Sequence, residues 1–525
     1  MKYRLQGLRL RYNRDNPENI KKRVQQILKI DESEILSVEI TSRSIDARKK
    51  PASIVYTMEI ELSDDCIVNG LEKISSYNKP KLTDFKKGTK PLNNRVVIAG
   101  AGPAGLFAGY LLAKNGYAPI IVERGGEIEQ RHKAIKDFLL SRVPDPDNNA
   151  LFGIGGAGTY SDGKLTTSVK HPLIRFILNT LVECGAPENI LIDAKPHIGT
   201  DVLSGVVNNL KDAIIKYGGE LRTNERVDSV VVKNGTLCGI KTSCNNIDTD
   251  VLIAATGHSA RDTIEMFVKN GVAVEPKPFQ MGFRIEHPQS WLDRQQYGDG
   301  AGHPALGAAT YKLTSRVGGV PVFSFCMCPG GSTIPTVNEA GHLCVNGMSM
   351  HARDGMFSSS GIVVTVAPEN YGAKNYKDAI DFVRSVEKKA FIKGGGDYTA
   401  PAQRFISFLK DKKDNSLPAS SYKPGVAAAD LREILPPFVS DSIKKAASGF
   451  NRSLPGFVHE DAVAIAPEAR ASSPVRIVRD KDTRESSVNG LYPAGEGSGY
   501  AGGIMSAALD GLNTAIIIME KYAPF

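Results

Sequence analysis

The stretch that decides the fold covers residues 95–123 and reads RVVIAGAGPAGLFAGYLLAKNGYAPIIVE. An apolar run leads into a glycine-rich turn, a helical pattern follows, and a second apolar run ends in an acid. Gly100 permits the tight turn, Gly102 lets the backbone approach a pyrophosphate, and Gly105 allows the helix to pack closely. The helix N-terminus offers free N–H groups and a positive dipole end to phosphates. The stretch therefore predicts a β-α-β unit that binds an adenine dinucleotide.

Glu123, the acid that ends the second run, is expected to accept hydrogen bonds from both hydroxyls of an adenosine ribose. A 2′-phosphate would be repelled at the same place. The alternative interpretation is a β-α-β turn with a structural role only. Residues 153–158 also fit the glycine pattern, but no apolar strand precedes them, so they do not predict a second dinucleotide site.

The far end of the chain indicates which dinucleotide is bound. Residues 491–496, LYPAGE, read as a strand that ends in an acid, residues 497–503 as a glycine-rich turn, and residues 504–519 as a helix. In FAD folds of the glutathione-reductase type, such an acid binds the ribityl and pyrophosphate region, and the helix points its N-terminus at the flavin pyrimidine edge. Reduced flavin carries negative charge near N1, which a helix dipole stabilises. The sequence therefore predicts FAD rather than NAD alone.

Five segments resemble a family of uncharacterised bacterial FAD-dependent dehydrogenases, distantly similar to geranylgeranyl reductases and p-hydroxybenzoate hydroxylase. They are residues 100–125 (GAGPAGLFAGYLLAKNGYAPIIVERG), 149–165 (NALFGIGGAGTYSDGKL), 255–263 (ATGHSARDT), 325–331 (FCMCPGG) and 490–511 (GLYPAGEGSGYAGGIMSAALDG). The resemblance implies the fold and the cofactor, and it implies no substrate.

The resemblance also suggests roles for residues between the two ends. The segment from Gly155 to Lys164 is expected to lie beside the isoalloxazine ring, with Lys164 or Asp162 facing flavin or substrate; the alternative is that these two merely pair with each other. Arg131 is expected to reach the pyrophosphate, as an arginine does in the hydroxylase relatives, or else to be a solvated helix charge. The complete set of candidate cofactor residues is Gly100, Gly102, Pro103, Ala104, Gly105, Glu123, Arg124, Arg131, Gly156, Gly158, Gly163, Lys164, Val227, Thr256, Gly257, Gly495, Glu496, Gly502, Gly503, Ile504 and Met505.

Cys326 and Cys328 follow a strand-like run and are expected to point to one face of it. Buried apolar cysteines are the favoured interpretation, with a dithiol or a metal site as alternatives. Cys-x-Cys with one further thiol, Cys344, lacks zinc spacing, and no metal site is predicted. No histidine stands out as a catalytic base, so the catalytic residues stay unassigned.

Composition bounds the remaining expectations. The 525 residues carry a net charge of +8, which suggests an anionic substrate or simply a solvated basic surface. Seven irregularly spaced cysteines argue against a secreted disulfide scaffold. Neither a signal peptide nor a membrane-spanning run is evident, so a cytoplasmic protein is expected.

The predicted fold class is α/β, with a three-layer FAD/NAD(P)-binding domain, an inserted α+β substrate domain and a small N-terminal α+β module. The predicted boundaries are 1–76 for a βαββ module, 77–91 for a linker, 92–275 and 456–525 for the two parts of the FAD-binding domain, and 276–455 for the substrate domain.

The predicted function is that of an FAD-dependent oxidoreductase, which transfers hydride between a small-molecule substrate of unknown identity and flavin N5. Any NAD(P)H is expected to dock only transiently or to be absent, and the physiological electron donor or acceptor stays open. A flavin-dependent hydroxylase or polyprenoid reductase is one alternative. An FAD-containing nucleic-acid modifying or binding protein is another, although a nucleic-acid partner is not favoured.

Overall fold

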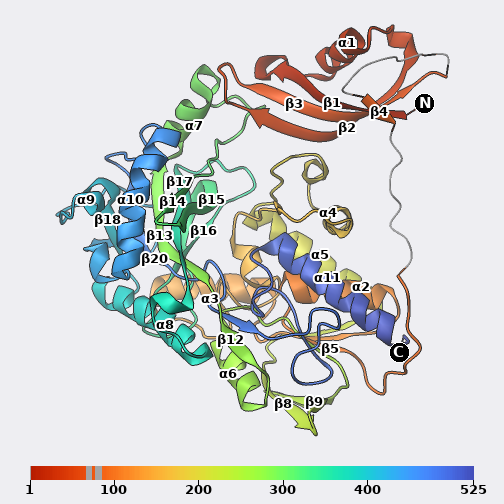
Figure 1. Cartoon of the computed structure of the whole chain (residues 1–525), viewed down its shortest axis with the longest axis vertical. Helices are drawn as coiled ribbons and strands as arrows, with labels where there is room; N and C mark the ends of the chain where they lie inside the picture. The colour runs from red at the N-terminus through yellow and green to blue at the C-terminus, as the bar shows by residue number, and fades with distance from the viewer. Residues whose placement is uncertain (1, 65, 67–73, 77–84, 525) are drawn as a thin grey trace.

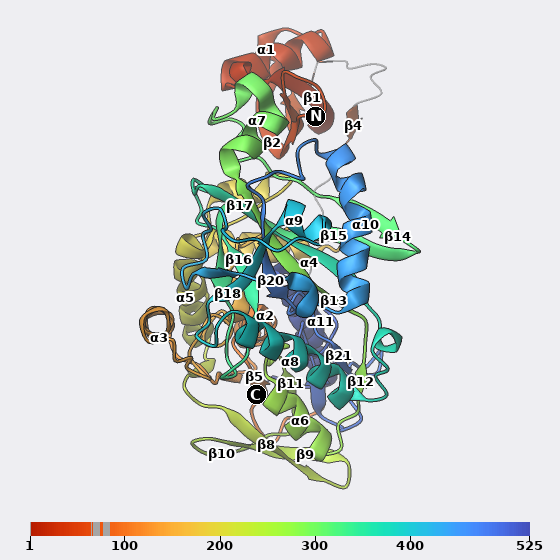
Figure 2. The ribbon, with the colours of Figure 1, turned by 90° about the vertical axis from the view of Figure 1, so that its left-hand side faces the viewer.

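The computed structural model describes residues 2–64, 66, 74–76 and 85–524. Figure 1 shows three regions: a small N-terminal module at the top and, below it, a region built on a larger sheet beside a region built on a parallel sheet that contains the C-terminus. Turned by 90°, the molecule is long, with the N-terminal module at one end (Figure 2).

The N-terminal module is a four-stranded antiparallel sheet with one helix. Its elements are β1 (Lys2–Arg11), α1 (Pro17–Leu28), β2 (Ile35–Asp46), β3 (Ser53–Leu62) and β4 (Ile74–Ser76), in the strand order β2-β3-β1-β4. The side chain of Asn16 caps α1 by accepting a hydrogen bond from Asn19 N at 2.9 Å, as the Asn-Pro start of this helix favours. The first four elements match the expected β-α-β-β order, and β4 was not expected.

Part of the predicted linker, residues 77–84, lies outside the described residues. Its remainder runs along the C-terminal helix α11 (Ile504–Lys521), where Gly88 N donates to Met519 O at 2.7 Å and Lys90 forms an isolated bridge with Tyr522.

A five-stranded parallel sheet forms the centre of the second region. Its order is β22 (Leu491–Pro493), β11 (Leu252–Ala254), β5 (Val97–Ala99), β6 (Ile120–Val122) and β7 (Glu220–Arg222). Every neighbouring pair is parallel. Residues 95–123 and residues 491–519, the two glycine-and-acid units of the sequence, therefore contribute strands to one sheet. β11 lies between β22 of the second unit and β5 of the first.

Two layers cover this sheet because its strands are apolar on both faces. Ile98, Ile121 and Ile253 face a helical layer of α2 (Pro103–Lys114), α4 (Leu173–Glu183), α5 (Thr200–Lys216) and α11. Val97 and Val122 face an antiparallel sheet of β8 (Val227–Lys233), β9 (Thr236–Thr242) and β10 (Asn246–Asp248). The predicted three-layer α/β fold is confirmed.

The third region is built on an eight-stranded sheet. Its strands are β13 (Phe279–Pro288), β14 (Thr314–Val317), β15 (Val320–Pro335), β16 (Val345–Met348), β17 (Phe357–Val366), β18 (Ala400–Arg404), β19 (Val426–Ala428) and β20 (Val463–Glu468). They follow the order β14-β15-β17-β13-β20-β18-β19, with β16 paired to β15. The helices of this region are α7 (Gln289–Tyr297), α8 (Tyr376–Lys393), α9 (Phe405–Leu409) and α10 (Pro437–Ser453).

β20 requires a correction of one predicted boundary. It lies between β13 and β18 in the larger sheet, so the division at residues 455/456 assigned a central strand to the wrong region. The apolar run AVAIA before Pro467 reads equally well as a strand of either sheet, because sheet membership is decided by long-range pairing.

Two connections join the larger sheet to the parallel-sheet region. β12 (Val274–Pro276) pairs antiparallel with β21 (Val475–Ile477) where the chain leaves and re-enters. The remaining helices, α3 (Ile128–Ser141) and α6 (Arg261–Lys269), pack against both regions.

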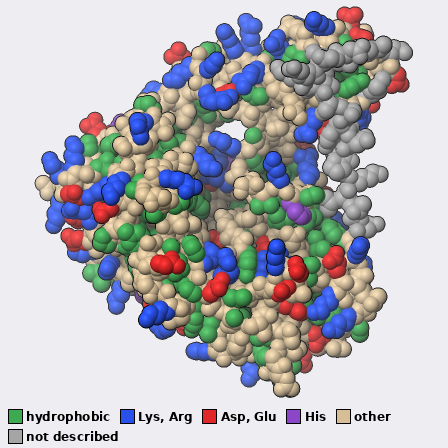
Figure 3. Space-filling model, viewed as in Figure 1, with side chains coloured by type: hydrophobic (Ala, Val, Ile, Leu, Met, Phe, Trp, Pro, Cys, Tyr) green, Lys and Arg blue, Asp and Glu red, His purple; other side chains and the backbone are tan. Residues whose placement is uncertain are grey.

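The N-terminal module touches the rest of the molecule at a few points. Arg43 N donates to Ile192 O at 2.7 Å, and the Arg43 guanidinium donates to Ala305 O at 2.6 Å. Tyr12 meets His303 edge-on. The space-filling view shows an opening below this module with Lys and Arg side chains around it (Figure 3).

Candidate functional site

A cavity of about 390 Å³ lies at the carboxyl ends of the parallel strands, where ligands bind in open α/β sheets. Its walls come from the turn before α2, the end of β6, the segment 156–166, the segment 255–263, and the turn before α11. The larger sheet closes it with Phe325, Cys326 and Asn346. The predicted strand-end residues Arg124, Val227 and Thr256 line it as well.

The glycines around the cavity divide into two kinds. A Cβ added at Gly102, Gly257, Gly502 or Gly503 would meet no protein atom within 4 Å, so these positions face open space. A Cβ at Gly105 would lie 1.9 Å from Gly100 O, so a glycine is needed here for α2 to pack against the turn that follows β5. Glycines of the first kind leave space at the cavity wall that a bound group can occupy. The glycine of the second kind lets the backbone segments that form the wall pack closely.

Four of the candidate cofactor residues do not line the cavity: Gly105, Arg131, Gly163 and Met505. Met505 is buried in the helical layer, because the second residue of α11 turns away from the cavity that Ile504 faces. Gly163 packs on the backbone of Gly199. The other candidates, Gly100, Pro103, Ala104, Gly156, Gly158 and Gly495 among them, do line it.

Glu123 is buried at the cavity wall and organises the turns around it. Its carboxylate accepts hydrogen bonds from the backbone N–H groups of Ala101 at 2.8 Å, Gly125 at 2.9 Å and Gly153 at 2.8 Å. These bonds tie the first glycine turn to the second glycine-rich segment. The motif-like run at 153–158 is therefore part of the same site and not a second dinucleotide site.

Arg131 does not line the cavity, which argues against the predicted contact with a pyrophosphate. Its guanidinium is fully buried and donates to three backbone oxygens, those of Asn149 at 3.2 Å, Ile154 at 2.5 Å and Gly156 at 3.0 Å. It also stacks on the Tyr160 ring. Arg131 is therefore neither a phosphate ligand nor a solvated charge, and it holds the segment 149–156 in place.

Asp162 and Lys164 pair with each other and also line the cavity, so the two interpretations of these residues do not exclude each other. Lys164 Nζ lies 3.3 Å from Asp162 Oδ2. Arg353 donates to the same carboxylate from its Nε and its Nη2. Burial opposes ionisation of Asp162, but Lys164 and Arg353 outweigh it and lower its pKa. Burial also opposes the charge on Lys164, yet Cys328, Cys326 and Asp162 raise its pKa. Both side chains line the cavity, so the pair is an ionised part of its wall.

Glu496 and His258 face each other at the opposite wall, with His258 Nδ1 3.7 Å from Glu496 Oε1. Burial lowers the pKa of His258 to about 3, with Arg470 and Arg261 adding to the effect, so this imidazole is neutral. Its Nε2 has no hydrogen-bond partner among the described residues. Burial raises the pKa of Glu496 to about 7, against the charge of Lys277. Both residues line the cavity, and the neutral imidazole of His258 keeps one buried nitrogen without a partner among the described residues.

The raised pKa of Glu496 predicts a pH dependence of the ligand-free protein. The folded state holds this proton more tightly than the unfolded state, so the stability it confers is complete below about pH 4 and disappears as the pH rises through about 7. The free energy of unfolding of Glu496→Gln should therefore fall less than that of the wild type between about pH 5 and pH 8, by roughly 1 kcal/mol, since the side chain is a quarter exposed. Urea titrations of both proteins at several pH values measure this; parallel pH profiles would contradict it.

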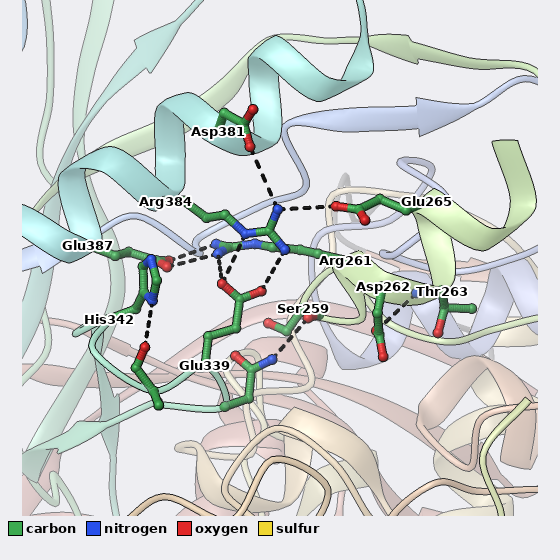
Figure 4. Close-up of polar contacts among 12 residues, drawn as sticks. Ser259, Arg261, Asp262, Thr263, Glu265, Glu339, His342, Asp381, Arg384 and Glu387 are labelled. Carbon is green, nitrogen blue, oxygen red and sulfur yellow. Dashed lines mark hydrogen bonds and ion pairs between the residues drawn. The ribbon is translucent and has the colours of Figure 1, made fainter. Parts of the chain in front are cut away.

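An ion network joins α6, α8 and the segment around residue 339 beside the cavity (Figure 4). Glu387, fully buried, accepts hydrogen bonds from Arg261 at 2.8 and 2.9 Å and from Arg470 at 2.7 and 3.0 Å. Glu339 bridges Arg261 and Arg384. Arg470 and Ser259 from this network also line the cavity. The network therefore fixes the larger sheet's region against the parallel-sheet region at the site.

Some lining residues had no signal in the sequence. Asn346 and Arg470 come from the larger sheet's region and its return segment, and nothing in their local pattern marks a cavity. Within the described residues no group of three or more His, Cys, Asp and Glu side chains is arranged to hold a metal ion. The same part of the chain contains no helix whose length and hydropathy would let it cross a membrane.

Comparison with known proteins adds family information to this geometry. Residues 278–471 match the family described as FAD-dependent protein, C-terminal domain-like, and residues 3–62 match a domain of unknown function. Thiamine thiazole synthase of Thermotoga maritima is 23% identical over 211 residues, which cover 38% of this chain and 70% of that protein. A geranylgeranyl bacteriochlorophyll reductase-like structure from Thermoplasma acidophilum is 11% identical with a TM-score of 0.34, covering 82% of this chain and 78% of that one.

The matched residues 278–471 coincide with the larger sheet, including β20. The match confirms the predicted dependence on FAD. An uncharacterized protein of Clostridium beijerinckii is 38% identical over 516 residues, which cover 97% of each chain. The chain therefore belongs to the same family as this Clostridium beijerinckii protein, a family of FAD-dependent proteins.

Proposed function

We propose that the protein is an FAD-dependent oxidoreductase that acts on a small anionic molecule. The observation that carries the cofactor part is one cavity framed by both glycine-and-acid units at the carboxyl edge of a parallel sheet. When bound there, FAD supplies two-electron hydride chemistry at its N5 atom. The protein supplies binding, orientation and electrostatics.

Different residues line the two ends of the cavity, and each end suits a different part of the cofactor. Glu123, Arg226 and Val227 form the end that suits the adenosine, and the N-terminus of α2 faces the pyrophosphate between the ends. The N-terminus of α11, with Gly503 and Ile504, forms the end that suits the flavin pyrimidine edge. A Cβ on Gly158 would lie 3.1 Å from Ile504, so the segment 156–164 runs beside this second end.

The substrate class is inferred from charge near Lys164. Burial lowers the pKa of Lys195, and Arg353, Lys164 and Lys312 lower it further by repulsion. One carboxylate, that of Asp162, pairs with two of these four cations. An anionic group on the substrate beside Lys164, which of these four lines the cavity, would relieve part of this repulsion, and this favours an anionic small molecule over a polyprenoid or a nucleic acid base.

The absorption spectrum of protein purified under native conditions tests the cofactor. Bands near about 370 and 450 nm that persist through gel filtration are expected. Anaerobic bleaching of the band near about 450 nm by a panel of matched carboxylates and neutral alcohols or amines then tests the substrate class. Absence of flavin, even after incubation with FAD, would refute the proposed function, and bleaching by neutral donors alone would refute its anionic substrate.

A further inference from the structure

Cys326 and Cys328 lie where β15 loses its regular pairing with β17. The register shifts between Phe325 and Cys328 and again between Cys328 and Gly331. Cys326 itself has a φ of 42°, a left-handed conformation that is unfavourable for a non-glycine residue. Strain of this kind persists where the surroundings impose it, and it is concentrated at functional sites.

The bend gives the two thiols different surroundings while keeping the two residues in contact. Cys326 lines the cavity, whereas Cys328 is fully buried. The Cys328 thiol donates a hydrogen bond to Cys326 O at 3.2 Å, so the buried sulfur lies against the backbone of the cavity-facing cysteine.

Cations from two different regions enclose the sulfur pair. Lys164 Nζ donates to Met327 O, between the two cysteines. From the other side, Arg284 Nη2 donates to Cys326 O at 2.8 Å and lies 3.8 Å from Cys328 Sγ. Arg284 is fully buried and is paired with Glu468 at 3.0 Å. Lys164 and Arg284 stabilise a thiolate at this place, and Glu468 opposes it.

The segment 156–164 runs from the start of α11 to the cysteines, which favours the end of the cavity proposed for the flavin as the place of the sulfur pair. Gly158 lies against Ile504 at the start of α11, and Lys164, six residues later, lies beside the cysteines. Glu123, Arg226 and Val227, at the adenosine end, belong to other elements of the wall.

We propose that Cys326 and Cys328 form a redox-active dithiol that exchanges two electrons with the bound flavin, an inference that rests on the proposed function. In the oxidative direction the Cys326 thiolate and the Cys328 thiol form an S–S bond. The two electrons and the Cys328 proton pass to oxidised flavin, which becomes the singly protonated reduced anion. The reverse reaction breaks the S–S bond and returns the proton to Cys328. Cys326, on the cavity side, is the sulfur that a second thiol or disulfide substrate reaches.

Reductive titration of the flavin-loaded protein under anaerobic conditions tests this exchange. The wild type, oxidised in air beforehand, should take up two electrons per flavin more than the Cys326→Ser and Cys328→Ser variants. Cys238→Ser, at a half-exposed cysteine of β9, is the matched control and should behave as the wild type. Two independent variants separate the loss of the dithiol from a folding defect, and retained flavin absorbance shows that the site is intact.

Alkylation followed by mass spectrometry gives a readout that does not depend on activity. The peptide that contains both cysteines should gain no label in the oxidised protein and two labels after flavin reduction. The hydrogen bond from Cys328, together with Lys164 and Arg284, lowers the pKa of the Cys326 thiol against burial and Glu468. Alkylation of reduced Cys326 should therefore begin at lower pH than is usual for a cysteine, and Lys164→Gln should move it to higher pH.

The outcomes separate the two proposals. Protein that never binds flavin refutes the proposed function and this inference with it. Flavin that takes up the same number of electrons in the wild type and in both serine variants, with free thiols at both positions throughout, refutes the dithiol alone.

Discussion

Gly102→Ala should weaken FAD binding by about a hundredfold or more, roughly 3 kcal/mol, while leaving the stability of the ligand-free protein nearly unchanged. A Cβ at this position meets no protein atom within 4 Å, and the backbone φ of −77° suits any residue. The methyl group therefore extends only into the cavity, where the backbone must approach the pyrophosphate closely. Fluorescence titration of the apoprotein with FAD measures the affinity, and thermal unfolding without FAD measures the stability.

Two other glycines provide controls for this result. Gly205→Ala in α5 also places its Cβ in open space, but away from the cavity, so FAD affinity should not change and helix propensity should slightly favour the variant. Gly105→Ala should instead destabilise the ligand-free protein, because its Cβ would overlap Gly100 O. Unchanged FAD affinity in Gly102→Ala would place the pyrophosphate elsewhere and reject the assigned orientation.

Glu387→Gln should lower the free energy of unfolding by about 3–5 kcal/mol, because it leaves two buried guanidinium groups without their shared carboxylate. Burial opposes ionisation of Glu387, but Arg261 and Arg470 outweigh it and hold its pKa well below the ordinary value. Its stabilising effect is thus present at neutral pH and is lost only in acid. Urea denaturation at neutral pH measures the change.

Lys377→Gln, on the same helix, is the matched control. Its exposed pair with Asp381 is of the surface kind that contributes about 1 kcal/mol or less. Equal losses in the two variants would show that the buried network adds nothing beyond surface pairing. Since Arg470 lines the cavity, Glu387→Gln should also loosen FAD binding.

The sequence predicted the parallel-sheet region well because its signals are local. At each end of the site a strand, a glycine turn, a helix and an acid stand close together in the chain, in the order strand, turn, helix, acid at the first end and strand, acid, turn, helix at the second. Glu123 and Glu496 could thus be named from spacing alone, and both line the cavity. The pKa of Glu496 could not be predicted, because it depends on burial by residues far away in the chain.

The larger sheet was predicted less well because its strand order depends on pairing between segments that lie far apart in the chain. β20 pairs with β13 and β18, strands far from it in the chain, and its sequence does not contain that information. Arg131 was misplaced because a helix charge and a fully buried donor look alike in sequence. The expectation that Cys326 and Cys328 share a face assumed a regular strand, whereas the strand is bent at Cys326.

The position of β22 at one edge of the parallel sheet has a consequence during synthesis on the ribosome. β11 is complete once residue 254 emerges, but its outer partner begins at Leu491. At about 5–20 residues per second, the nascent chain holds an unpaired edge of β11 for roughly ten seconds or more. Cofactor loading must wait for the same strand and the helix after it. Until Leu491–Pro493 emerge, that open edge is free to pair with other chains, which is a consequence of the order in which this chain is translated.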